Sequence, residues 1–219
     1  MKLKISFILN VLIVLMVLFA SIVMFANIKF MSGSEIVLES TGIGMFRFFT
    51  VDSNFFMGIV ALLYSIEEIK ILKDKTYKIS RKLNIFKYMA TVSVSLTCFV
   101  VFVYLGRIVN GGIVVLLQNS NLFFHLIIPV TAFLTFVLFE RNNDLKYKNT
   151  FYCLIPALVY GVFYLINVLI HMENGSVLPK YDWYYFVQNG VWTSLIVLPA
   201  ILFITYILGL IIWALNHKK

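Results

Sequence analysis

The sequence ISFILNVLIVLMVLFASIVMFAN, residues 5–27, contains no charged side chain and is apolar at nearly every position. A helix needs about 20 such residues to cross the hydrocarbon core of a bilayer, which is about 30 Å thick. Five further apolar runs follow, at residues 48–66, 86–106, 121–139, 151–170 and 190–215. We therefore predict an all-α integral membrane bundle of six transmembrane helices.

The composition supports this class, because 61% of the residues are hydrophobic and only 13% are charged. Soluble domains carry about 25% charged residues. No internal repeat and no Pro-rich or Gly/Ser-rich linker divides the chain, so residues 1–219 are predicted to form a single domain. The first run follows Lys2 and Lys4, but it is longer than the roughly 7–15 apolar residues of a signal peptide, and we expect it to be retained.

The basic residues indicate the orientation. Of the 18 Lys and Arg residues, 14 lie before the first run, around the second and fourth connections, or at the C-terminus. The other four are Lys29, Arg47, Arg107 and Lys180. Cytoplasmic loops carry the excess of Lys and Arg, so we predict that both termini are cytoplasmic. We expect a multi-pass protein of the plasma membrane.

The net charge of +8 is therefore expected at the cytoplasmic face, and no nucleic acid is expected as a partner. The densest basic stretch, residues 67–87, mixes basic and apolar residues in a way that suits a short helix on anionic lipid headgroups. Its simplest role is to determine the topology.

In this orientation the runs 48–66 and 121–139 both begin at the outer face. At about 100° per residue, Thr50, Ser53 and Asn54 share one arc of the first helix, whereas Asp52 points away. Unpaired polar groups that face lipid are costly, so we expect this arc to turn into the bundle.

The second helix brings Asn121 and His125 to one face, which we also expect to turn inward. Pro129 lacks the N–H that would bond the carbonyl of His125, and the sequence predicts a bend with a freed acceptor at the histidine. A polar pocket at this position is one interpretation. The alternative is that Thr50 or Ser53 caps a helix while His125 bonds another span.

Three cations near the outer face, Arg47, Arg107 and Lys180, are candidates to hold an anionic headgroup or a fatty carboxylate, or are ordinary interfacial residues. The aromatic residues at 183–186 are typical of an interfacial belt. Glu140 lies about 22 Å below His125 on the same side of its helix, too far for direct participation. Nucleotide-binding glycine motifs and metal-ligand spacings are absent from the sequence, so neither a metal nor another cofactor is expected.

Several short motifs carry a family resemblance. Phe48-Phe49-Thr50, then His125-Leu126-Ile127-Ile128-Pro129, and then Glu140 occur in an order and spacing that resemble the androgen-induced-gene family. That family includes the androgen-dependent regulator of tissue factor pathway inhibitor and has six-span bacterial relatives. The segment Leu178-Pro179-Lys180-Tyr181-Asp182-Trp183 is similar to the Tyr-Pro-Phe-Leu-Asp/Glu segment of the family.

This resemblance implies a threonine hydrolase of fatty acid esters of hydroxy fatty acids, with Thr50 as nucleophile and His125 as base. The segment Thr50-Val51-Asp52-Ser53-Asn54 looks closer to the bacterial Thr-x-x-Ser-Asn form, whose members largely lack an assigned activity.

Two hypotheses from different classes follow. The first is a membrane-embedded hydrolase of lipid esters, in which Ser53, Asn54 or Asn121 donates to the developing oxyanion. The second is a non-catalytic six-span protein that binds or transports a lipid or small solute through the same polar cluster. A membrane lipid or fatty acid ester is the expected partner under the first hypothesis.

The first prediction tests the topology. Single cysteines introduced into residues 30–45 or 172–182 of a cysteine-free variant should react with an impermeant maleimide added to intact cells, whereas cysteines in 72–82 should react only after lysis. The opposite labelling pattern would reverse the orientation and place the Thr50 cluster at the cytoplasmic face.

Overall fold

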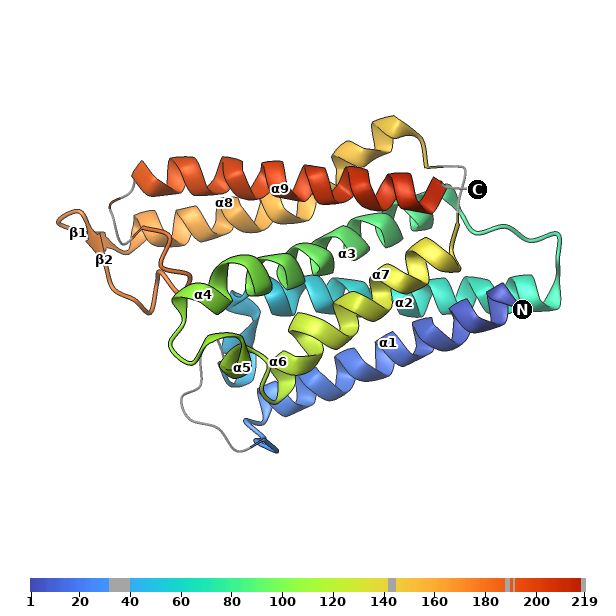
Figure 1. Ribbon diagram of the computed structural model, residues 1–219, viewed down its shortest axis with the longest axis horizontal. Coiled ribbons are helices and arrows are strands. Elements are labelled where there is room, and N and C mark those ends of the chain that lie inside the picture. Colours follow the sequence, from blue (N-terminus) through green and yellow to red (C-terminus); the bar gives the residue numbers. More distant parts are fainter. Residues whose placement is uncertain (32–39, 142–144, 188–189, 191, 218–219) are drawn as a thin grey trace.

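The computed structural model describes residues 1–31, 40–141, 145–187, 190 and 192–217, except for the side chains of residues 194 and 195. The described chain is mostly helical (Figure 1). The long helices are α1 (Lys2–Phe25), α2 (Phe49–Lys73), α3 (Arg81–Val100), α7 (Ile128–Leu138), α8 (Leu154–Ile170) and α9 (Trp192–His217). Shorter helical pieces are η1 (Gly42–Arg47), η2 (Val101–Leu105), α4 (Gly106–Ile108), α5 (Gly112–Leu116), α6 (Ser120–Leu122), η3 (Phe123–Ile127) and η4 (Tyr147–Cys153). A small antiparallel hairpin pairs β1 (Met172–Glu173) with β2 (Ser176–Val177).

Among the described residues, five helices are long and apolar enough to cross a membrane. They are Lys2–Phe25, Arg81–Ile108, Ser120–Leu138, Tyr147–Ile170 and Ile196–His217. The prediction of a helical chain with several membrane-compatible helices is therefore confirmed. Helix α2, which corresponds to the predicted span 48–66, is not among the five. Six spans and cytoplasmic termini stay predictions.

The helices form a core group and an outer pair. Helices α1, α2, α3 and α7 pack against one another, while α8 and α9 pair and lie against α3 (Figure 1). The start of α1 and the end of α9 lie at the same end of the bundle. The main core mixes large side chains with small ones such as Ala61 and Ala90, and the small side chains let the helices approach closely.

Helix α2 buries more than one side because it lies between α1 and α3. Its buried positions include Val51, Asn54, Gly58, Ala61 and Ser65, which recur every three or four residues as one face of a helix does. Polar groups occur on this buried side at both ends of α2. They give the helix contacts that a lipid-facing helix could not satisfy.

The short surface helix suggested by residues 67–87 is not a separate element. Helix α2 continues to Lys73 and α3 begins at Arg81, where the Ser80 hydroxyl accepts a hydrogen bond from the Leu83 amide. Between them, Asp74 forms a turn by accepting bonds from the Thr76 amide and hydroxyl at 2.9 and 2.7 Å. These hydrogen bonds lower the pKa of the Asp74 carboxyl.

A close contact between α1 and α2 generates the second prediction. A Cβ atom at Gly58 would lie 2.9 Å from Val17 Cγ1, so Gly58→Ala forces the valine or the helix to move. We expect it to lower the free energy of unfolding by about 1–3 kcal/mol, measured by thermal or denaturant unfolding in micelles. In a Val17→Ala background the added methyl has room, and the same substitution should cost much less. An equal cost in both backgrounds would contradict close packing at this point.

Candidate functional site

Thr50 lies in the first turn of α2, immediately after the short helix η1. Its carbonyl accepts hydrogen bonds from Ser53 Oγ at 3.1 Å and Asn54 Nδ2 at 2.7 Å. Ser53 Oγ also lies 3.1 Å from Thr97 Oγ1 of α3. The polar arc predicted from the sequence therefore does turn into the bundle, where these contacts fix the first turn of α2.

The segment that carries His125 is a π-helical turn. Here the Ile128 amide donates to the carbonyl of Phe123, five residues back. In this register the donor that Pro129 lacks is the one that would have reached Phe124, not His125. The freed acceptor predicted at His125 is thus displaced by one residue, because the π turn shifts the hydrogen-bond register.

Asn54 of α2 supplies the missing donor. Its Nδ2 donates to the Phe124 carbonyl at 3.0 Å as well as to Thr50, so both amide hydrogens of Asn54 are used by main-chain acceptors. This contact joins the Thr50 turn directly to the π turn of the fourth predicted span. It also means that Asn54 holds the backbone at the site.

His125 is almost completely buried, with 1% of its surface exposed. Its Nδ1 lies 2.6 Å from the carbonyl of Leu116 in α5. A carbonyl can only accept, so Nδ1 carries the proton and the neutral ring keeps its lone pair on Nε2. This is the tautomer that a general base needs, oriented by a second group as in other nucleophile and base pairs.

The Thr50 and His125 side chains do not share a hydrogen bond in the described part of the chain. Their backbones are neighbours through Asn54, but the His125 ring turns toward α5, whereas Thr50 lines a cavity whose other walls come from α3, η2, α8, α9 and the loop before α9. Close contact of the two functional groups, which the sequence predicts, would need a bridging water or a rotation of one side chain.

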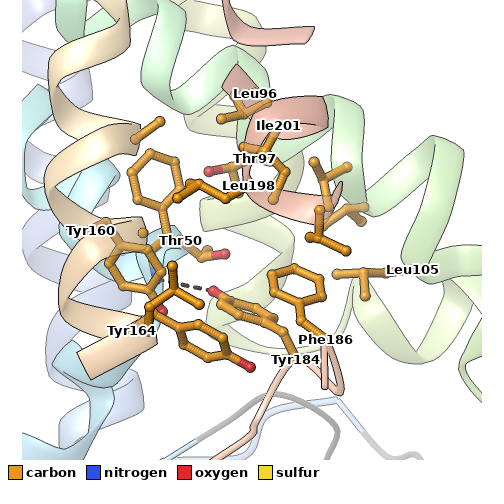
Figure 2. A pocket seen from close by; sticks show the side chains of 17 residues that line it. Thr50, Leu96, Thr97, Leu105, Tyr160, Tyr164, Tyr184, Phe186, Leu198 and Ile201 are labelled. Carbon is orange, nitrogen blue, oxygen red and sulfur yellow. Dashed lines mark hydrogen bonds between the residues drawn. The ribbon is translucent and has the colours of Figure 1, made fainter. Parts of the chain in front are cut away.

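Thr50 lines a cavity of about 80 Å³, which we call the Thr50 cavity (Figure 2). Its wall is mostly apolar and comes from α2, α3, η2, α8, α9 and the loop before α9. The lining residues are Phe49, Thr50, Leu96, Thr97, Val100, Val101, Leu105, Ala157, Tyr160, Gly161, Tyr164, Leu165, Tyr184, Phe186, Val197, Leu198 and Ile201. Such a surface suits a short stretch of a lipid tail.

Tyr184 places a second hydroxyl beside Thr50. Figure 2 shows its hydroxyl directed toward the start of α2, where it accepts a hydrogen bond from the Phe49 amide at 3.0 Å. Burial raises the pKa of Tyr184 to about 12, partly offset by hydrogen bonds to Tyr160, to the Phe49 amide and to Thr50. The phenol is therefore neutral at physiological pH and can donate a hydrogen bond.

The loop that carries Tyr184 is held by Asp182, which is 2% exposed. Its carboxylate accepts bonds from the amides of Phe186 and Val187 at 2.9 and 3.1 Å and from the hydroxyl of Tyr164. The predicted aromatic belt is thus wrong for Tyr184, which is 9% exposed and points inward. The sequence contained a signal for this, because Asp182 stands beside a run of aromatic residues. A carboxylate that is buried with such a run needs hydrogen-bond donors around it.

A second cavity, of about 640 Å³, adjoins the Thr50 cavity, and we call it the Arg47 cavity. It shares Phe49, Tyr160 and Tyr164 with the Thr50 cavity. Its other lining residues are Phe46, Arg47, Asp52, Ser53, Phe56, Pro156, Val159, Phe163, Asn167 and Trp183. Within the described residues, Arg47 Nε is buried and has no hydrogen-bond partner.

The remaining candidates are more distant. Arg107 and Lys180 are exposed and line neither cavity, and the Lys180 ammonium lies 4.7 Å from the centre of the Tyr181 ring. Asn121 is buried near the start of η3 but also lines neither cavity. Of the three predicted cations, Arg47 is the one that the structure brings to the Thr50 region.

Three residues that line the Thr50 cavity were not predicted from the sequence: Thr97, Tyr160 and Tyr164. The four-residue spacing of the two tyrosines does put them on one helix face.

The described residues contain no group of three or more His, Cys, Asp or Glu side chains that could hold a metal ion. No protein-family model matches the chain, and no curated protein and no solved structure shows significant similarity to it. The function must therefore be argued from the site itself.

The contact between Asn54 and Phe124 generates the third prediction. Asn54→Ala leaves a buried carbonyl without a donor and should lower the free energy of unfolding by about 1–3 kcal/mol. Pro129→Ala restores a backbone N–H, and in that background the cost of Asn54→Ala should shrink. A double-mutant cycle of unfolding measurements gives the coupling. Additive effects would show that Asn54 does not substitute for the missing proline donor.

Proposed function

We propose that this protein is a membrane hydrolase of lipid esters that uses Thr50 as its nucleophile. The observation that carries the proposal is the position of Thr50, whose side chain lines an apolar cavity beside a neutral tyrosine hydroxyl. The Arg47 cavity adjoins it, and Phe49 lines both. An elongated lipid with an acyl chain at one end and an anionic group at the other matches this pair of cavities.

In the proposed reaction, Thr50 Oγ1 attacks the ester carbonyl and gives its proton to Nε2 of His125, directly or through one water. The tetrahedral intermediate collapses, the ester C–O bond breaks, and the proton passes to the departing alcohol. Water then attacks the acyl-threonine, and the fatty acid leaves. Since Asn54 is occupied by main-chain acceptors, the Tyr184 hydroxyl is the better donor to the oxyanion.

The substrate class that we propose, fatty acid esters of hydroxy fatty acids, rests on the resemblance to the androgen-induced-gene family. It agrees with Arg47, because such a substrate carries a carboxylate in addition to its ester. Asp52 lines the same cavity and repels a carboxylate, so we expect the substrate carboxylate to lie beside Arg47. The plasma membrane is the location that we propose, and anionic headgroups are the proposed partners of the basic 67–87 connection.

A second candidate function has an observation of its own. The described side chains of Thr50 and His125 share no hydrogen bond, and Nδ1 of His125 is held by Leu116. A protein that binds or transports a lipid without cleaving it would need the two cavities but not a nucleophile and base in contact. Lipid binding is therefore the alternative to catalysis.

The fourth prediction separates these functions. In purified protein reconstituted in nanodiscs, His125→Ala should lower the rate of lipid-ester hydrolysis by about 10²- to 10⁴-fold. Thr50→Ala should abolish it, and the double variant should be little worse than Thr50→Ala alone, because residues acting as a unit are not additive. Thr50→Ser should keep partial activity, since the hydroxyl survives.

Thr135→Ala and His171→Ala are matched controls. The Thr135 hydroxyl donates to the Thr131 carbonyl in its own helix, and His171 Nδ1 lies 2.8 Å from the carbonyl of Asn167. Both variants should retain activity. If hydrolysis persists in Thr50→Ala and His125→Ala, or if the wild type cleaves no lipid ester while binding a fluorescent fatty acid, the hydrolase is rejected in favour of lipid binding.

A further inference from the structure

A buried cluster of charged and polar groups lies at the other end of α2, far from Thr50. Helices α1, α2, α3 and α7 meet here, at the end of the bundle where α1 begins and α9 ends (Figure 1). Asn10 of α1 donates from Nδ2 to Glu68 Oε2 at 3.1 Å and to Glu140 Oε1 at 2.7 Å. Its Oδ1 accepts from the ammonium of Lys87. One asparagine thus links two carboxylates and a lysine.

The charges in this cluster do not balance. The side chains of Lys87 and Glu140 are fully buried, with Nζ and Oε1 3.3 Å apart, and Glu68 is 1% exposed. Among the described residues this is the single ion pair that the cluster contains. Two carboxylates and one ammonium leave one negative charge uncompensated inside the bundle, which is costly in the absence of a further partner.

The hydrogen-bond donors do not reach every carboxylate oxygen. Ser6 Oγ and Asn10 Nδ2 both donate to Oε1 of Glu140, at 3.2 and 2.7 Å, and Lys87 Nζ lies 3.3 Å from the same oxygen. Oε2 of Glu140 is buried and has no partner within the part of the chain that the structure describes. The cluster lacks one positive charge and at least one donor, and a proton on a carboxyl group supplies both.

The surrounding groups do not supply that charge. Helix α1 contributes only the neutral Ser6 and Asn10, while α3 adds Asn84, which accepts from the Tyr64 hydroxyl of α2 at 3.1 Å. The Tyr64 ring centre lies 5.1 Å from Lys87 Nζ, and helix α9 brings Asn216, which donates to the Glu140 carbonyl at 3.2 Å. The titratable groups that face the cluster are therefore Glu68, Glu140, Lys87 and the phenol of Tyr64.

We propose that this cluster is a binding site for one exchangeable proton, which Glu68 holds beside the ion pair of Lys87 and Glu140. With the proton bound the cluster is neutral, and α1, α2, α3 and α7 pack without an unpaired charge. Loss of the proton leaves a buried negative charge between them. The site therefore couples the packing of this end of the bundle to pH, and it is independent of the hydrolase proposed above.

The sign of the effect follows from proton linkage. The folded cluster holds a proton that an unfolded glutamate, with a pKa of about 4.3, has released at neutral pH. Protonation therefore stabilises the folded state in the neutral range, and this stabilisation is lost as pH rises through the point where the cluster deprotonates. In nanodiscs the thermal midpoint of the wild type should fall by about 3 °C per pH unit between about pH 4.3 and the pH at which the folded cluster deprotonates.

The fifth prediction uses variants with neutral side chains. Glu68→Gln removes the excess negative charge, so its thermal midpoint should be independent of pH over the same interval and exceed that of the wild type at alkaline pH. Glu67→Gln is the matched control: the neighbouring Glu67 is held at the surface by Lys70, with a 2.7 Å ion pair, and by the Tyr77 hydroxyl. The control should keep the pH dependence of the wild type.

A spectroscopic readout identifies the proton directly. The infrared C=O stretch of a protonated carboxyl group should be present in the wild type and in Glu67→Gln at neutral pH, and absent from Glu68→Gln and Glu140→Gln. If Glu140→Gln does not fold, Glu68→Gln alone provides the test. An unchanged infrared C=O band in Glu68→Gln, or an unchanged pH dependence of its thermal midpoint, would overturn the proposal. A thermal midpoint of the wild type that follows sodium concentration at fixed pH would also overturn it, because it would indicate a bound metal cation.

Discussion

The hydrogen bond from Asn54 to the carbonyl of Phe124 determines how the Thr50 end of this bundle is assembled. Pro129 removes one backbone donor from a buried helix, and the π turn before it decides which carbonyl loses its partner. Inside a membrane bundle that carbonyl cannot be solvated by lipid, so a neighbouring helix must satisfy it. Asn54 does so, and the same side chain bonds Thr50, so the Thr50 turn and the His125 turn are positioned by one residue.

The Tyr184 loop completes this arrangement from the opposite side. Asp182 holds the loop through two backbone amides and the Tyr164 hydroxyl, and Tyr184 then caps the first turn of α2 by accepting from Phe49. Helix α2 has no side-chain cap of its own at Phe48. The loop before α9 thus performs a task that an N-cap residue usually performs, and it encloses the Thr50 cavity in doing so.

The sequence was sufficient to predict most of the long helices, but only part of the site. Runs such as 121–139 and 151–170 agree closely with Ser120–Leu138 and Tyr147–Ile170, because an apolar run long enough to cross a bilayer has few alternatives to a helix. The inward direction of Thr50, Ser53 and Asn54 followed from helical periodicity. The π turn, which moves the free acceptor from His125 to Phe124, depends on the local hydrogen-bond register, and no residue pattern revealed it.

Residues distant in the sequence were the hardest to predict. Lys87 was counted with the basic residues of a cytoplasmic connection, yet its side chain is fully buried beside Glu140. The sequence places Glu140 too far from His125 for direct participation, and no pattern in it predicts the contacts of Glu140 with Ser6 and Asn10 of α1. A charged residue near the end of an apolar run can turn outward to headgroups or inward to a partner, and only the helix packing decides between them.

Helix α2 is fixed by polar contacts at both of its ends. Asn54 and Glu68 are 14 residues apart, about four helical turns, so they lie close to one face, and both are buried. Apolar contacts alone specify the position of a membrane helix weakly, because lipid tails are as apolar as the side chains that they replace. The directional hydrogen bonds that Asn54 donates to Phe124 and that Glu68 accepts from Asn10 oppose rotation and sliding of α2. The position of Thr50 therefore depends on both ends of the helix, including the end that lies far from it.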